Sequence, residues 1–113
     1  MLYLKSINIP NSLISIGDYC FYKCSNLTTI NIPNSVISIG DYCFSNCSNL
    51  AAVDIPASVT YIGNDCFENC SKLKKIEIDS DHPKYYTNDG HTIKRKDNNK
   101  VVDNNEEVDV WSW

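Results

Sequence analysis

The stretch LTTINIPNSVISIGDYCFSNCSN, residues 27–49, holds the pattern that decides the fold of this chain. Residues 4–26 have almost the same sequence, and residues 50–72 are a more diverged copy. A fourth copy begins at residue 73 and loses the pattern after residue 78. Self-similarity at a fixed step is the sequence signature of repeat architectures. The 23-residue step therefore predicts a solenoid in which each copy is one structural unit.

Several residue types recur at this step in every full unit. Because one unit cannot bury its apolar face alone, stacked units are expected to bury a continuous core. The recurring positions are Pro10, Pro33 and Pro56; Gly17, Gly40 and Gly63; Phe21, Phe44 and Phe67; and Leu4, Leu27, Leu50 and Leu73.

Each unit is expected to contain two short extended segments. In residues 27–33, Ile30 and Ile32 alternate with polar residues, which is typical of a half-buried strand. Pro33 ends this strand because it has no N–H to donate to a neighbour. Residues 35–40 form the second extended segment. Stacking then predicts a parallel sheet with strands roughly 4.8 Å apart.

A helical turn is expected after the second extended segment. Gly40 would supply a positive φ, and Asp41 would be the N-cap of one or two helical turns over residues 42–47. Cys43 and Cys47 lie four residues apart, so on a helix they would share a face with the phenylalanine between them. That face is predicted to point inward.

The line L-x-x-I-x-I-P-x-S-V-x-x-I-G-x-x-C-F-x-x-C resembles the leucine-rich repeats of the BspA-like type, found in bacterial surface antigens and in some parasitic protists. The resemblance covers residues 4 to about 78. It implies an α/β repeat solenoid: a right-handed leucine-rich-repeat superhelix with short parallel strands and short helical turns. The family line has Ala where this chain has Cys20, Cys43 and Cys66, and it has the cysteine found here as Cys24, Cys47 and Cys70. Serine takes the usual Asn-ladder position at Ser12, Ser35 and Ser58.

The C-terminal part departs from the repeat. Residues 81–102 resemble the N-P-x-Y-x-x-x-D-G segment that often follows such repeats, although Asp81 and His82 stand at the usual Asn. Alternation in HTIKRK and an Asn-rich turn predict a loop followed by a β-hairpin. The expected division is a solenoid over residues 1–78 and a capping loop, hairpin and tail over residues 79–113. The tail's Trp111 and Trp113 either cover the open end of the solenoid or come from a truncated reading frame.

Composition narrows the function class. The net charge of −4 disfavours nucleic acid as a partner, because neutralising phosphates takes clustered Lys and Arg. No apolar run approaches the roughly 20 residues of a membrane span. The start, MLYLKSINIP, lacks the pattern of a signal peptide. The expected location is cytoplasmic if the chain is complete, and the cell surface or the outside if it is a fragment.

The six cysteines allow three readings. As buried thiols, they would form columns of small apolar groups in the core. As disulfides, a bridge between units, such as Cys24 to Cys47, is within reach, whereas a bridge within one helix is poorly placed. As metal ligands, C-x3-C differs from the usual C-x2-C knuckle, and no histidine lies in the repeats. The prediction is that all six are reduced, buried and free of metal.

A second polar cluster follows the repeats. His82 and His91 with Asp79, Asp81 and Asp89 fit either a catalytic or metal site or a polar loop that caps the last unit, and the loop is favoured. No serine or cysteine nucleophile has a recognisable setting, so neither an enzyme nor a cofactor is expected. The basic run at 93–100 is predicted to be a solvated hairpin rather than a nucleic-acid patch, since acidic residues surround it.

The resemblance implies a binding solenoid, and the expected function is a non-enzymatic protein–protein interaction module, as in a fragment of a surface adhesin. The alternatives are a structural spacer or remnant without its own ligand, and a metal or redox protein that uses the cysteine columns. Binding is expected on the concave sheet face, through the outward strand residues. These residues are Ser6, Asn8, Thr29, Asn31, Ala52, Asp54, Lys75 and Glu77.

Overall fold

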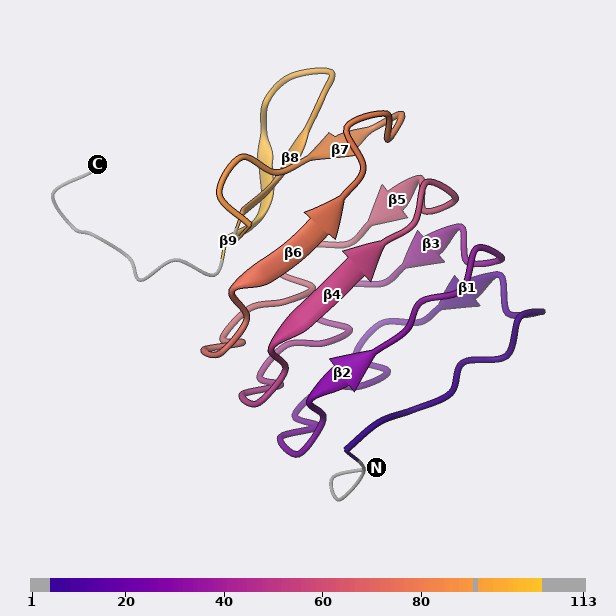
Figure 1. The fold of residues 1–113 in the computed structure, drawn as a ribbon, viewed down its shortest axis with the longest axis vertical. Helices are drawn as coiled ribbons and strands as arrows, with labels where there is room; N and C mark the ends of the chain where they lie inside the picture. The colour runs from indigo at the N-terminus through magenta and orange to yellow at the C-terminus, as the bar shows by residue number, and fades with distance from the viewer. Residues whose placement is uncertain (1–4, 91, 105–113) are drawn as a thin grey trace, which may run out of the picture.

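The computed structural model describes residues 5–90 and 92–104, which form a stack of coils followed by a C-terminal ribbon (Figure 1). The strands make three sheets of three strands each. One sheet contains β1 (Ser15–Ile16), β3 (Ser38–Ile39) and β5 (Tyr61–Ile62). The second contains β2 (Thr29–Ile30), β4 (Ala52–Ile55) and β6 (Lys75–Ile78). The third, here called the C-terminal ribbon, contains β7 (Tyr85–Tyr86), β8 (Thr92–Arg95) and β9 (Val101–Asn104).

Both sheets of the coils are parallel, and each strand pairs with the equivalent strand of the next unit. Thr29 is opposite Ala52, and Ala52 is opposite Lys75. On the other side of the stack, Ser38 is opposite Tyr61. The parallel stacking predicted from the 23-residue step is therefore confirmed. The handedness of the superhelix stays a prediction.

The core runs along the axis of the stack as columns of identical side chains. Phe44 is fully buried between Phe21 and Phe67, with ring centroids 5.2 Å and 5.3 Å away and nearly parallel planes. Leu27 and Leu50 are likewise fully buried, one above the other in the repeat. Each coil therefore buries its apolar side chains against the equivalent residues of its neighbours.

The predicted helical turns are wrong. The part of the chain that the structure describes contains no helix, and residues 42–47 form turns instead. Tyr42 and Asn46 have φ values of 56° and 61°, which lie in the left-handed region and interrupt any right-handed helix. Alternate backbone N–H groups here bond to the next coil, as when Phe44 N donates to the Cys66 carbonyl at 2.8 Å, and those between them close tight turns, as when Cys47 N donates to the Phe44 carbonyl at 3.2 Å.

The predicted role of Gly40 is also wrong, because among the described glycines Gly90 is the one with a positive φ. Gly40 is needed instead for close stacking. A Cβ at this position would lie 2.5 Å from the backbone nitrogen of Asp18 and 2.6 Å from the carbonyl carbon of Gly17. Gly63 contacts the coil before it in the same way.

Asp41 does not cap a helix; it joins two coils. Its backbone N–H donates to Oδ1 of Asp18 at 2.8 Å, and its own Oδ1 accepts from the backbone N–H of Asn64 at 2.8 Å. A carboxylate in one coil thus satisfies a backbone donor in the next. The N-cap interpretation of Asp41 is therefore replaced by a ladder between units.

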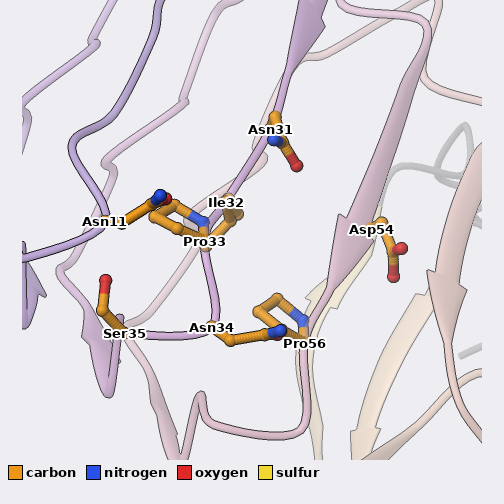
Figure 2. A pocket seen from close by; sticks show the side chains of 8 residues that line it. All are labelled: Asn11, Asn31, Ile32, Pro33, Asn34, Ser35, Asp54 and Pro56. Atoms are coloured by element: carbon orange, nitrogen blue, oxygen red, sulfur yellow. The ribbon is translucent and has the colours of Figure 1, made fainter.

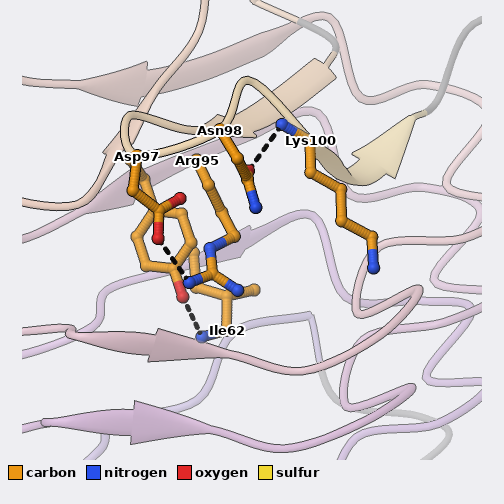
Figure 3. A network of polar contacts seen from close by, with 6 residues as sticks. Ile62, Arg95, Asp97, Asn98 and Lys100 are labelled. Atoms are coloured by element: carbon orange, nitrogen blue, oxygen red, sulfur yellow. Dashed lines mark hydrogen bonds and ion pairs between the residues drawn. The ribbon is translucent and has the colours of Figure 1, made fainter.

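The third sheet covers the last coil. β8 pairs antiparallel with β7 and β9, in the segment where the sequence predicts a hairpin. The Tyr85 hydroxyl accepts the backbone N–H of Ile62 at 2.9 Å (Figure 3). The Gly90 carbonyl accepts the backbone N–H of Ile76 at 2.9 Å. The ribbon thus supplies hydrogen-bond acceptors to backbone N–H groups of the last coil, as the next coil does elsewhere in the stack. The tail tryptophans lie outside the described residues.

Replacing Tyr85 by phenylalanine is expected to destabilise the chain by about 1–3 kcal/mol, because the buried N–H of Ile62 would lose its acceptor. Urea unfolding followed by circular dichroism measures the loss. The control is the same change at Tyr86, whose hydroxyl donates to Asn99 at 2.7 Å at an exposed position. Equal losses for the two variants would contradict the capping role of Tyr85.

Candidate interaction surface

The outward side chains of the sheet β2-β4-β6 form two rows along the stack. Thr29, Ala52 and Lys75 are in register in one row. In the other row, Asn8 is opposite Asn31 and Asp54 is opposite Glu77. Of the eight residues predicted for this face, seven are exposed and Ala52 is half-buried.

The rows change in charge from the first coil to the last. The row of Asn8, Asn31, Asp54 and Glu77, here called the outer row, has asparagine at its first two positions and carboxylates at its last two. Glu77 forms an ion pair with Lys75 at 3.0 Å, with both side chains more than half exposed. Such an exposed pair contributes little to stability, so these side chains are available to a partner.

A polar groove of about 520 Å³ opens beside the rows (Figure 2). Asn31 and Asp54 line it from the strands, and Asn11 and Asn34 line it from the turns that follow the prolines. A second groove of about 390 Å³ lies next to it and also includes Asp54. The turn asparagines were not predicted for this surface. The sequence does carry a signal for them, since Asn11 and Asn34 follow the same 23-residue step.

The serines at the usual Asn-ladder position form no ladder. The hydroxyls of Ser35 and Ser58 are buried and have no hydrogen-bond partner among the residues that the structure describes. Ser12 lies at an exposed position in the first coil. Of these two residues, Ser35 lines the groove.

The cysteine columns face the core, and all six residues, which lie within the described ranges, are unbridged. Cys47 donates its thiol to the Phe21 carbonyl at 3.2 Å, and Cys70 donates to the Phe44 carbonyl at 3.1 Å. Burial raises the pKa of Cys47 to about 12, so its reactive thiolate is scarce at neutral pH. The prediction that all six are buried is wrong for Cys20, which is exposed because no coil is stacked on its outer side among the described residues.

In the folded protein, a thiol reagent at neutral pH is expected to modify Cys20 before unfolding, because it is exposed, and the other five cysteines only on unfolding. Burial raises the pKa of Cys20 as well, so this first phase should be slower than that of a free thiol. Counting released thiolate before and after denaturation, without reductant, measures both phases. The variant Cys20→Ser should lose the first phase and keep five slow thiols. A total below six in denaturant would show disulfides and favour the secreted interpretation of the chain.

His82 does not join an acidic cluster. Its side chain is fully buried, whereas Asp79, Asp81 and Asp89 are exposed. His91 lies outside the described residues, and within them no group of three His, Cys, Asp or Glu side chains is placed to hold a metal ion. The described residues therefore do not bring His82 together with these carboxylates, and the capping role of the loop stays a prediction.

The hydrogen bonds of His82 define its tautomer. Nδ1 accepts the backbone N–H groups of Lys84 and Tyr85, each at 3.1 Å, so the ring proton belongs on Nε2. Nε2 faces the carbonyls of Pro56 and Val59, without a hydrogen bond of standard geometry within the described ranges. Burial is the largest cause that lowers the pKa of His82 below its usual 6.5, and these two carbonyls oppose that shift.

Stability is expected to fall as the pH drops below about 6.5, because the unfolded chain then binds a proton on His82 that the folded chain does not. The contribution is complete above the unfolded pKa and is lost as the pH falls toward the lowered folded pKa. Urea unfolding between pH 5 and 7.5 measures this slope, and an NMR titration of the ring measures the folded pKa. A folded pKa above 6.5 would contradict the buried neutral tautomer.

Comparison of the chain with known proteins gives one family match and several similar solved structures. A family model described as the BspA type leucine rich repeat region, in six copies, matches residues 1–89. No curated protein matches the chain. Within the described residues, no helix has the length and hydrophobicity that crossing a membrane requires.

Three solved structures are similar to the chain. A leucine rich cell surface protein from Faecalibacterium prausnitzii is 31% identical with a TM-score of 0.76, and the match covers 88% of this chain and 26% of that protein. The pneumococcal vaccine antigen PcpA is 27% identical with a TM-score of 0.78, over 88% and 25% of the two chains. A leucine rich repeat protein from T. pallidum is 36% identical with a TM-score of 0.61, over 62% and 33%. The chain thus spans between a quarter and a third of these proteins.

Proposed function

The chain belongs to the BspA-type leucine-rich repeat family, and on that premise we propose that it is a non-enzymatic module whose concave sheet face binds a protein partner. One observation carries the proposal: two rows of mostly exposed side chains run along β2, β4 and β6 and the residues next to them, beside a polar groove. An adhesin-like form of this function is favoured by the similarity to a leucine rich cell surface protein.

The chemistry of the rows suggests what the partner presents. Asn31 and the turn asparagines Asn11 and Asn34 offer both donors and acceptors, which suit the backbone of an extended segment. Asp54 and Glu77 add negative charge toward the last coil. Because large aromatic anchors are absent from the described part of this face, three units are expected to bind weakly. The proposed partner surface is therefore polar, with a basic end over Asp54 and Glu77.

Matched charge substitutions on the two sheets test the proposal. Proteins captured by the immobilised chain from its native source would be purified and titrated against it by calorimetry. The variant Asn31→Arg should abolish saturable binding, because Asn31 is exposed in the outer row and lines the groove. The control Ser15→Arg adds the same charge at an exposed position of β1, on the opposite sheet, and should leave binding unchanged.

Two outcomes would overturn the proposal. Saturable binding that survives Asn31→Arg would place the interface elsewhere on the molecule. The absence of any partner that binds with saturation would favour the structural spacer, in which the repeats hold other parts of a longer protein apart. Circular dichroism of both variants shows whether each keeps the fold, since both positions are exposed.

A further inference from the structure

A second cavity lies between the last coil and the C-terminal ribbon. Its volume is about 170 Å³, and its walls come from β5, β7, β8 and β9 and the segments beside them. Tyr61 and Val101, both about half exposed, supply apolar walls, and Asn64 supplies an amide. Sites for small ligands are typically concave, with apolar walls and a few convergent polar groups. This cavity combines a few such walls with a mainly polar lining, and it shares no lining residue with the two grooves beside the sheet β2-β4-β6.

Three cationic side chains line the cavity, and they come from three different segments. Lys84 precedes β7, Arg95 ends β8, and Lys100 precedes β9. Figure 3 shows Arg95 and Lys100 extending from the ribbon toward the coil that holds Ile62. Residues far apart in the sequence thus line one pocket that is open to solvent, since all three cationic residues are exposed.

The charge of this region opposes that of the rest of the chain. Residues 84–100 contain five of the ten Lys and Arg residues and only two of the fourteen acidic residues, whereas the whole chain has a net charge of −4. Self-repulsion of clustered cations is unfavourable, and a concave site with one sign of charge concentrates counter-ions of the other sign. The clustering therefore indicates an anionic ligand.

The balance of charges at the cavity indicates the charge of the ligand. Asp97 forms an ion pair with Arg95 at 2.7 Å and neutralises one of the three positive charges (Figure 3). Among the described residues, the side chains of Lys84 and Lys100 have no ion pair. Among the side chains that the structure describes at this cavity, two positive charges therefore remain, which match an oxyanion that carries two negative charges. Phosphate groups carry about −1.5 to −2 at pH 7, and they accept several hydrogen bonds from Arg and Lys.

We propose that the cavity lined by Lys84, Arg95 and Lys100 binds a phosphate dianion, either as the free ion or as the phosphate group of a small phosphomonoester. Lys84 and Lys100 supply the two uncompensated charges, and Arg95, oriented by Asp97, supplies planar N–H donors. Asn64 also lines the cavity. This site is separate from the protein-binding surface and would exist whether or not that surface has a partner.

An NMR titration of the folded chain with inorganic phosphate at pH 7.5 tests the proposal, with ionic strength held constant by sodium chloride. Backbone amide signals of Ile62, Asn64 and Arg95 are expected to shift with saturation, while those of Asn31 stay fixed. A parallel titration with glycerol phosphate distinguishes the source. Saturation by both probes indicates a phosphomonoester site, and saturation by inorganic phosphate alone indicates a free-ion site.

A matched pair of substitutions separates a specific site from general attraction. Lys100→Gln should weaken phosphate binding by about tenfold, which corresponds to ~1.4 kcal/mol. Lys94→Gln removes the same charge from a residue of β8 that does not line the cavity, and it should change binding less than twofold. Lys100 is exposed and Lys94 is half-buried, and circular dichroism of both variants shows whether each keeps the fold. Shifts without saturation, or equal weakening by the two variants, would overturn the proposal.

Discussion

Replacing Gly40 by alanine is expected to destabilise the chain by about 3 kcal/mol or more, at the upper end of the range for overpacked sites. The added Cβ would lie 2.5 Å from the backbone nitrogen of Asp18 and 2.6 Å from the carbonyl carbon of Gly17. Both atoms belong to the backbone of the neighbouring coil, so no side-chain rotation relieves the contact. The coils must separate locally, and the hydrogen bond from Gly40 N to the Ile16 carbonyl at 2.8 Å would weaken.

The chain contains its own control for this substitution. Gly17 occupies the same position of the first unit, and a Cβ there meets no atom of the described residues within 4 Å. Gly17→Ala should therefore be neutral or slightly stabilising, by up to ~1 kcal/mol, because alanine reduces the freedom of the unfolded chain. Urea unfolding of the two variants gives the comparison. If both lost the same stability, glycine would be required for its own conformation rather than for stacking.

Phe44→Ala is expected to cost about 3–5 kcal/mol, the usual loss for deleting a buried aromatic side chain. The Phe44 ring is fully buried and stacks on Phe21 and Phe67 at once. Its removal would leave a cavity in the middle of the column, and both neighbouring rings would lose a partner. The coils cannot close the gap, because their spacing is fixed by the hydrogen bonds of the sheets on either side.

The position of a phenylalanine within the column should determine its effect. Phe21 stacks on one neighbour within the described column and is 7% exposed, so Phe21→Ala should cost less than Phe44→Ala. Phe44→Leu keeps most of the volume and should also cost less. Chemical unfolding with fluorescence or circular dichroism measures all three. A larger loss at Phe21 than at Phe44 would contradict a core that is built by stacking.

The repeat itself could be predicted from the sequence, whereas the local structure of its turns could not. The spacing of Cys43 and Cys47 fits a helix face, yet the segment forms turns with left-handed residues at Tyr42 and Asn46. Asn is common in the left-handed conformation, but Tyr is not, so the residue type indicates this conformation at Asn46 and not at Tyr42. The deciding term is not local: hydrogen bonds to the next coil replace those that a helix would make.

The candidate surface was partly accessible to the same reasoning. Alternation in the strands identified Asn31 and Asp54, because inward and outward residues follow a period of two. The turn residues Asn11 and Asn34 enter the groove through the path of the chain after the prolines, which alternation does not describe. Similarly, the burial of five cysteines follows from the pattern, whereas the exposure of Cys20 depends on its position in the first coil. Whether the face binds a protein stays a prediction.

The carboxylate of Asp18 accepts the backbone N–H of Asp41, and the carboxylate of Asp41 accepts that of Asn64, so the same hydrogen bond connects each of these coils to the next. Because the acceptor and the donor recur at the same step, a coil that carries both groups can join a coil on each side. Unequal recombination of the gene that removes or adds one whole unit would leave every joint intact. A deletion of any other length would break the alignment of carboxylates, glycines and phenylalanines together. Variation in the length of such arrays among related genes should therefore occur in whole units, with the C-terminal ribbon left unchanged.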